Sequence, residues 1–134
     1  MRFTKSRAAL AALVAVVALL PGAAHAAPVG SDVVYVTEGL SVAVGTCTVV
    51  AVDHGEGRRT YVVAGHAKAV GAIATSVGCG IVQNGVVIAY FRAALPGSVA
   101  AGVWTTVAGD GTYSVCADVS ATFGNGSVEQ NNCP

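Results

Sequence analysis

The sequence contains little charge and few aromatic side chains. Charged residues make up 10% of its 134 residues, and aromatic residues make up 6%. Seven Lys and Arg residues stand against seven Asp and Glu residues, and the four basic residues beyond residue 26 are scattered, so no basic block is available there to follow a nucleic-acid backbone. No basic amphipathic helix is present to hold the chain on an anionic membrane. Nucleic acid and the membrane surface are therefore not expected as partners.

No apolar run is long enough to cross a bilayer, which takes roughly 20 residues. The longest uninterrupted run covers residues 8–20, follows three basic residues and precedes the small-residue pattern Ala24-His25-Ala26. This order is typical of a secretory signal peptide. We expect residues 1–26 to be a signal peptide that is cleaved after Ala26, leaving a secreted mature protein without a membrane anchor.

The expected mature chain, residues 27–134, is the length of one small domain. It keeps four basic residues against seven acidic ones, so it is weakly acidic although the precursor is neutral. Its loops are short, and it shows neither a linker nor an internal repeat. We therefore expect a single domain.

Cysteine is scarce but even in number, and every cysteine lies in the mature part. The four are Cys47, Cys79, Cys116 and Cys133. An even number in an exported domain predicts two disulfides. A structural metal site is not expected, because the chain has no C-x-x-C pair and only two mature histidines, His54 and His66.

Helical periodicity is missing, whereas short β-branched runs separated by Gly, Asn and Asp recur along the mature chain. We expect strands near residues 33–37, 42–52, 60–69, 73–83, 86–94, 98–107, 112–123 and 127–133. Asn84-Gly85 predicts a type I′ hairpin turn. The expected fold is an all-β, immunoglobulin-like antiparallel β-sandwich of about seven strands with two disulfides. A small closed β-barrel is the alternative.

The last hairpin predicts how the cysteines pair. Between residues 112 and 123 apolar and polar residues alternate, so Cys116 and Asp118 should point away from the core with the polar set, on the face exposed to water. A two-residue turn at Gly124-Asn125, of type II′ because Gly comes first, places Cys133 directly opposite Cys116. Such a non-hydrogen-bonded pair brings side chains close enough for a disulfide.

We therefore favour one disulfide between Cys116 and Cys133 and a second between Cys47 and Cys79. The main rival joins Cys79 to Cys116 and Cys47 to Cys133, which a sandwich would also allow. Connectivity cannot be deduced from sequence alone, so both pairings stay open at this point.

Two polar features could carry chemistry. Asp53, His54 and Glu56 cluster in one segment and are residue types that bind cations or act as acid and base, but no partner ligand is identifiable elsewhere, so we interpret the segment as a solvated hairpin loop. His66 alternates with small apolar residues, which indicates the exposed face of a strand. No serine stands in a G-x-S-x-G elbow. We expect no catalytic, cofactor-binding or metal-binding residue and no enzymatic activity.

The segment from Val86 to Leu95 holds the main aromatic feature before the C-terminal hairpin. Its even positions place Tyr90 and Arg92 on one face, and its odd positions place Phe91 on the other. The strand could be covered on both sides or irregular. Alternatively, Tyr90 and Arg92 form an exposed patch, and these two residue types often anchor protein interfaces.

The mature chain as a whole resembles small secreted actinobacterial proteins of unassigned role. The segments that carry the likeness are "ATSVGCGIVQNG", "ALPGSVAAG" and "YSVCADVSATFGNGS", together with the terminal cysteine. The resemblance implies a sandwich and export but no activity. In composition and size the chain is also similar to the enediyne-binding apoproteins of the neocarzinostatin type, whose disulfides close much shorter loops, so no binding residue is transferred.

The function expected from the sequence is that of a secreted, non-enzymatic extracellular interaction module with an unknown partner. Two alternatives stay open. A small-molecule carrier would need an apolar cleft, and an inhibitor of secreted proteases would need a rigid exposed loop held by a disulfide.

Overall fold

The computed structural model describes residues 25–134, which form eight β-strands and no helix. The strands are β1 (His25–Glu38), β2 (Ser41–Gly55), β3 (Arg58–Lys68), β4 (Ala74–Gln83), β5 (Val86–Pro96), β6 (Val99–Val107), β7 (Ser114–Phe123) and β8 (Gly126–Asn131). Most of the expected signal peptide lies outside the described residues. His25 and Ala26 begin β1, and cleavage after Ala26 stays a prediction.

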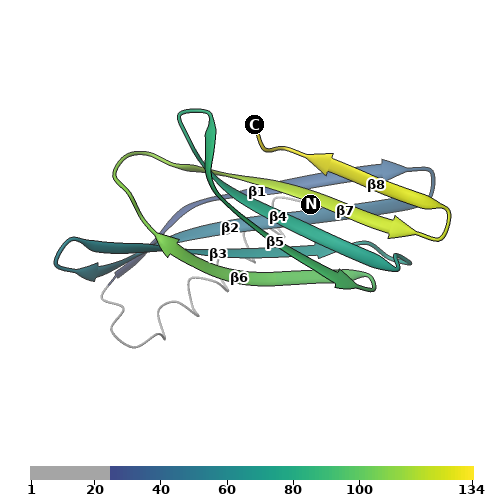
Figure 1. Ribbon diagram of the computed structural model, residues 1–134, viewed down its shortest axis with the longest axis horizontal. Helices are drawn as coiled ribbons and strands as arrows, with labels where there is room; N and C mark the ends of the chain where they lie inside the picture. The colour runs from purple at the N-terminus through teal and green to yellow at the C-terminus, as the bar shows by residue number, and fades with distance from the viewer. Residues whose placement is uncertain (1–24) are drawn as a thin grey trace.

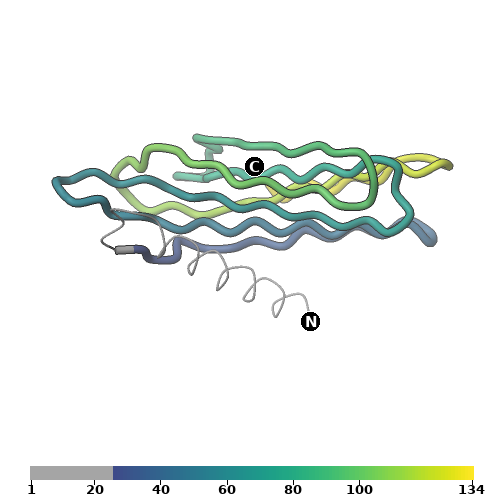
Figure 2. The backbone as a smooth tube through the Cα atoms, turned by 90° about the horizontal axis from the view of Figure 1, so that it is seen from below, coloured from purple at the N-terminus to yellow at the C-terminus, as the bar shows by residue number. Residues whose placement is uncertain are grey.

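The strands form two antiparallel four-stranded sheets, which Figures 1 and 2 show as two stacked layers. The first sheet has the order β1-β2-β3-β6, and the second has the order β5-β4-β7-β8. The expected β-sandwich is confirmed. The alternative of a closed barrel is wrong, because each sheet keeps two edge strands instead of closing on itself.

The strand order explains why eight strands are present instead of about seven. In the first sheet β2-β3-β6 correspond to immunoglobulin strands A, B and E, and in the second β5-β4-β7-β8 correspond to C′, C, F and G. Strand D has no counterpart in the described residues. Strand β1 is an addition that pairs with β2 along the outer edge of the first sheet.

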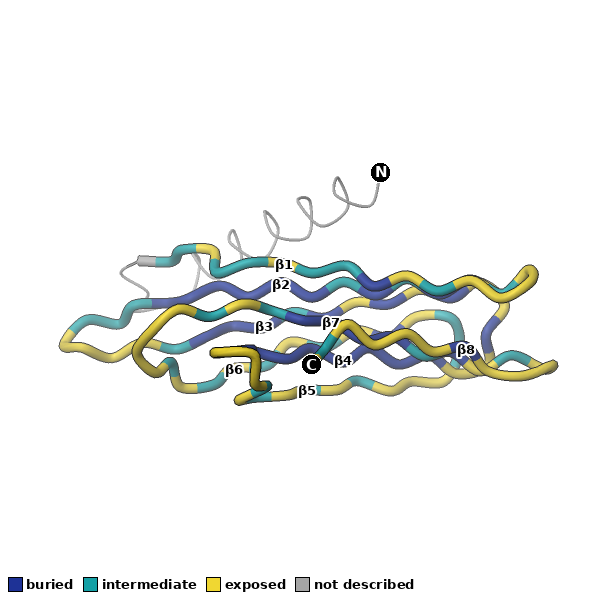
Figure 3. The backbone as a smooth tube through the Cα atoms, turned by 90° about the horizontal axis from the view of Figure 1, so that it is seen from above, coloured by how far each residue is buried: buried dark blue, intermediate teal, exposed yellow. Residues whose placement is uncertain are grey.

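The core lies between the sheets and consists mainly of valine and alanine. Alternate side chains of each strand point into this core, as a half-buried antiparallel sheet requires. Its fully buried members include Val34, Ala43, Val49, Val63, Ala67, Val77, Ile81, Ala117 and Val119. Burial is greatest on β2 and β4, whereas β5 is mostly exposed (Figure 3).

Both disulfides follow the pairing that the sequence favours. Cys47 on β2 bonds Cys79 on β4 across the core, with 5.6 Å between Cα atoms and both residues 0% exposed. Cys116 on β7 bonds Cys133, with 5.0 Å between Cα atoms. The rival pairing is absent. The first bond fastens the two sheets to each other, and the second fastens the C-terminal segment to β7.

The turns set the register where the two hairpins of the second sheet begin, and an irregularity between Ile81 and Val82 then shifts the rest of the β4–β5 ladder by one residue. Asn84 and Gly85 have φ of 53° and 76°, which agrees with the expected type I′ turn. The turn between β7 and β8 joins Phe123 to Gly126 and keeps the expected register. Its predicted type II′ geometry is wrong, because Gly124 does not have the positive φ that this turn needs. The positive φ lies instead at Gly126, the first residue of β8.

Candidate functional site

The outer face of β5 is an exposed row of apolar and polar side chains. Ile88 is 51% exposed and Tyr90 is 44% exposed, and Arg92 continues the row. Phe91 points the other way and stacks on Trp104 of β6, with 5.7 Å between ring centroids. Of the two interpretations that the sequence left open, the exposed Tyr90 and Arg92 patch is the one present in the structure.

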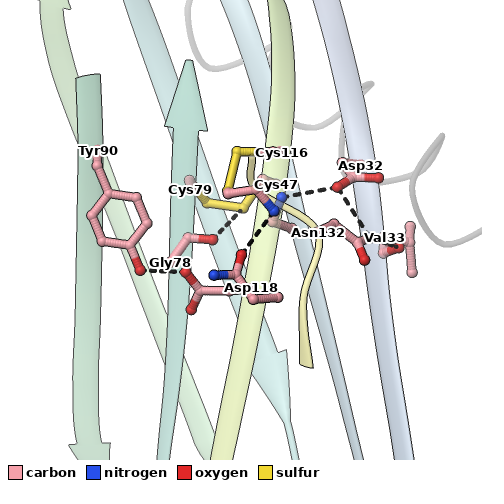
Figure 4. The surroundings of a disulfide bond; sticks show 12 residues. Asp32, Val33, Cys47, Gly78, Cys79, Tyr90, Cys116, Asp118 and Asn132 are labelled. Atoms are coloured by element: carbon pink, nitrogen blue, oxygen red, sulfur yellow. Dashed lines mark hydrogen bonds between the residues drawn. A yellow bond between two sulfur atoms is a disulfide. The ribbon is translucent and has the colours of Figure 1, made fainter. Parts of the chain in front are cut away.

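Small residues on β4 make room for these large side chains. Tyr90 lies opposite Gly80, and Arg92 lies opposite Gly78. A Cβ atom at Gly78 would collide with the Tyr90 hydroxyl and with the Asp118 carboxylate. The Tyr90 ring therefore crosses β4 and reaches β7 (Figure 4).

The Tyr90 hydroxyl donates a hydrogen bond to Asp118 Oδ2 (Figure 4). Asp118 is only 9% exposed, so this carboxylate is shielded by the aromatic ring. Partial burial of the hydroxyl and, next, its hydrogen bond to Asp118 raise the pKa of Tyr90 to about 12. The pair holds Tyr90 in one orientation on the sheet.

One expectation about this face needs correction. Cys116 and Asp118 do point away from the core, as their place in the alternation predicts, but neither is exposed to water. Tyr90 covers Asp118 from β5, and the disulfide to Cys133 brings the C-terminal segment over Cys116. The alternation of polar residues along β7 predicts the correct face for Cys116 and Asp118. It does not show that residues from other parts of the chain cover this face.

An alkaline titration tests the pairing of Tyr90 with Asp118. We expect Tyr90 to ionise near pH 12 instead of near the ordinary 10.0. Because the pKa is raised in the folded state, the neutral phenol stabilises the fold fully below pH 10, and this contribution is lost as the pH rises from 10 to 12. The absorbance of tyrosinate in the wild type, minus that of Tyr90→Phe, measures the step. A difference centred near pH 10 would contradict the pairing.

A groove of about 370 Å³ lies next to Arg92 on this outer face. Arg92 Nη2 donates hydrogen bonds to Ser76 Oγ at 2.9 Å and to Ser120 Oγ at 3.4 Å. Ile73 and Leu95, both substantially exposed, contribute apolar walls. Among the described residues the guanidinium thus hydrogen-bonds to hydroxyls and forms no ion pair with a carboxylate, and its charge also acts on the neighbouring Tyr90, whose pKa it lowers in opposition to Asp118.

The sequence missed three residues of this site, namely Ser76, Ser120 and Asp118. A signal was present, because Ser76, Gly78 and Gly80 alternate on one face of β4 as residues too small to fill it. Such a row indicates that large side chains from a neighbouring strand cover this face of β4. The pattern does not show which strand does so.

The acidic and histidine cluster forms the end of the β2–β3 hairpin. Asp53 Oδ1 accepts a hydrogen bond from Gly55 N at 2.9 Å, His54 Nε2 lies 2.8 Å from Thr60 Oγ1, and Glu56 has φ of 55°. The Asp53 side chain thus takes part in the turn, and the His54 side chain contacts the neighbouring strand, as in a polar hairpin end. Residues 25–134 contain no group of three or more potential metal ligands.

His66 is exposed on the outer face of the first sheet, as expected. Its neighbours across the strands are Thr46 on β2 and Ala101 on β6. Ala101 has no reactive side-chain group, and the Thr46 hydroxyl donates a hydrogen bond to the backbone oxygen of His66 at 3.3 Å instead of to the imidazole, so neither neighbour forms a nucleophile–base pair with His66. His66 and the groove beside Arg92 lie on the opposite outer faces of the sandwich.

Comparisons with known proteins place no further residue in the site. No protein-family model, curated protein or solved structure matches this chain. Within residues 25–134 there is no helix with the length and hydropathy of a membrane span. The two disulfides fit an oxidising extracellular environment. The function therefore has to be inferred from the geometry of the groove.

Proposed function

We propose that this protein is a secreted, non-enzymatic interaction module that binds its partner with the outer face of the second sheet. The observation that carries the proposal is the guanidinium of Arg92, which is held by two serine hydroxyls at the edge of a groove. Tyr90 stands beside it and is fixed by Asp118. Tyr and Arg are the residue types that most often dominate binding energy at interfaces.

The chemistry of the groove favours a partner with a carboxylate next to an apolar group. Arg92 offers a cationic, planar donor, which suits a carboxylate. Ile73 and Leu95 offer apolar surface on either side. An acidic side chain or a chain terminus of another extracellular protein combines the two features.

The site is also prepared for binding before a partner arrives. Arg92 and Tyr90 project from a strand instead of a loop, and each is held by hydrogen bonds to β4 or β7. Side chains that are already ordered lose less conformational entropy on association. This rigidity supports recognition and makes a large rearrangement on binding unnecessary.

The proposal that the protein is not an enzyme rests on the separation of its titratable groups. His54 lies at the end of β2 with its Nε2 atom 2.8 Å from Thr60 Oγ1, and His66 lies on the face opposite the groove. General acid–base catalysis requires such groups within hydrogen-bond reach of a common substrate. Arg92, Tyr90 and the serines instead provide donors suited to recognition.

A small-molecule carrier is the second candidate function. The groove volume of about 370 Å³ falls within the range of small-ligand sites, although the groove lies on the outer face instead of between the sheets. No observation favours a protease inhibitor, because the disulfides join strands β2 to β4 and the C-terminal segment to β7.

Capture from culture supernatant with the immobilised protein tests the proposal. We expect a bound extracellular protein whose affinity falls at least about thirtyfold for Arg92→Ala, the effect of a hot-spot residue. Tyr90→Ala should weaken binding in the same direction. Titration of the identified partner measures both changes.

Val86→Ala is the matched control, because Val86 is exposed on the same strand and does not line the groove. Its binding should equal that of the wild type. A partner that binds all three variants equally would place the interface elsewhere. If only a small molecule is retained, and Arg92→Ala releases it, the carrier function is correct instead.

A further inference from the structure

Strand β6 is an open edge of the first sheet. Among the described strands it pairs with β3 alone. The ladder is regular, and its two ends are hydrogen bonds from Ala69 N to Ser98 O and from Ala108 N to Arg59 O. By alternation, the even-numbered residues of β6 bond to β3. The odd-numbered residues from Val99 to Val107 therefore direct their N–H and C=O groups toward the open side.

The other three edge strands have features that oppose pairing with a further strand. Strand β5 contains Arg92 and Pro96, which lacks an N–H group. Strand β1 contains Asp32, which accepts hydrogen bonds from Ala117 N and Asn132 Nδ2. Strand β8 is only six residues long and contains Glu129. These edges are blunted by charge, by proline or by short length.

Strand β6 has none of these features. Its sequence, VAAGVWTTV, contains no charged residue and no proline over nine residues. Val103 is 67% exposed and Val107 is 80% exposed on its outer side. On the inner side the Trp104 ring lies over Gly102 of its own strand and against Phe91. A long, uncharged, regular edge of this kind is a template for another strand.

We propose that β6 pairs in antiparallel orientation with β6 of a second copy of this chain. A two-fold axis at Val103 places this residue opposite its own copy, Ala101 opposite Thr105, and Val99 opposite Val107. All of these residues have their backbone groups directed to the open edge, so each opposed pair exchanges hydrogen bonds. The interface is isologous, as two-fold dimers require.

The side chains suit a second copy, because the opposed residues carry no charge and those on the outer face are of similar size. The pairing centred on Val103 engages the full strand. Shifting it by two residues in either direction leaves part of each edge unpaired, and one of these shifts sets Trp104 opposite Trp104. The dimer would contain one continuous eight-stranded sheet. This inference does not depend on the groove beside Arg92, which lies on the other sheet.

Sedimentation velocity of the purified, oxidised protein over a range of concentrations tests the inference. We expect a dimer that dissociates on dilution. Val103→Lys should weaken the dimer at least about a hundredfold, because two lysines would face each other at the centre of the pairing. Amide exchange should be slower at Ala101, Val103 and Thr105 in concentrated than in dilute wild-type protein.

Ile88→Lys is the matched control, since Ile88 is an exposed aliphatic residue on β5, an edge strand of the second sheet. It should dimerise like the wild type, and circular dichroism should show both variants folded. A monomer at every concentration would overturn the inference. A dimer that resists Val103→Lys, or that Ile88→Lys disrupts, would overturn it as well.

Discussion

Replacing Cys47 and Cys79 together with alanine is expected to lower the free energy of unfolding by about 4 kcal/mol. The two cysteines are 32 residues apart in sequence, and freeing a loop of that size returns substantial entropy to the unfolded chain. Both are fully buried between the sheets, so packing is lost as well. A domain with roughly 5–15 kcal/mol of total stability would lose a large part of it. Urea unfolding followed by the fluorescence of Trp104 measures the change.

The second disulfide provides the comparison. Cys116 and Cys133 are 17 residues apart, and their removal should cost about 3 kcal/mol or less, because the C-terminal segment retains the pairing of β8 with β7. If removing this bond proved more damaging than removing the bond between the sheets, the central role of Cys47 and Cys79 would be wrong.

Gly65→Val is expected to destabilise the protein by about 3 kcal/mol, the upper end of the usual cost of overpacking a core. Gly65 faces the core from β3, where a Cβ atom would lie 2.8 Å from Cys79 Sγ and 3.2 Å from Trp104 Cζ3. Cys79 Sγ cannot easily withdraw, because it is bonded to Cys47 on β2, the strand next to Gly65 in the first sheet. The same urea experiment measures this loss.

Gly30→Ala is the control for Gly65→Val. Its nearest neighbour would be Val115 Cγ1 at 3.6 Å, an ordinary van der Waals contact, so the midpoint of unfolding should change little. Gly65→Ala should fall between the two. Unchanged stability of Gly65→Val would mean that the sheets can separate at this point without cost.

The features that the sequence predicts correctly depend on neighbours in the chain. The alternation from residue 112 to residue 123 and the short turn after it determine the register of β7 with β8. That register sets Cys133 against Cys116, since Asn132 N still donates to Ala117 O beyond the end of β8. Local periodicity and turn length were sufficient here because the paired residues are close in sequence.

The features that the sequence does not predict depend on contacts between distant strands. The exposed face of β5 follows from the alternation of its residues. The hydrogen bond between Tyr90 and Asp118, however, depends on β4 pairing with β5 on one side and with β7 on the other. Nothing local to either residue specifies that arrangement. In the same way, the burial of Asp118 depends on the Tyr90 ring, which another strand supplies. The alternation of β7 alone therefore predicts that Asp118 is exposed.

The bond between Cys116 and Cys133 has a mechanical consequence. A pulling force applied at Pro134 enters the fold through Cys133 and passes across the disulfide to β7, which lies between β4 and β8. Strand β8 lies inside the loop closed by this bond, so it cannot be peeled away from its free end. Asn132 adds hydrogen bonds to Asp32 and Val33 of β1. Tension on the C-terminus is thereby distributed over both sheets at once.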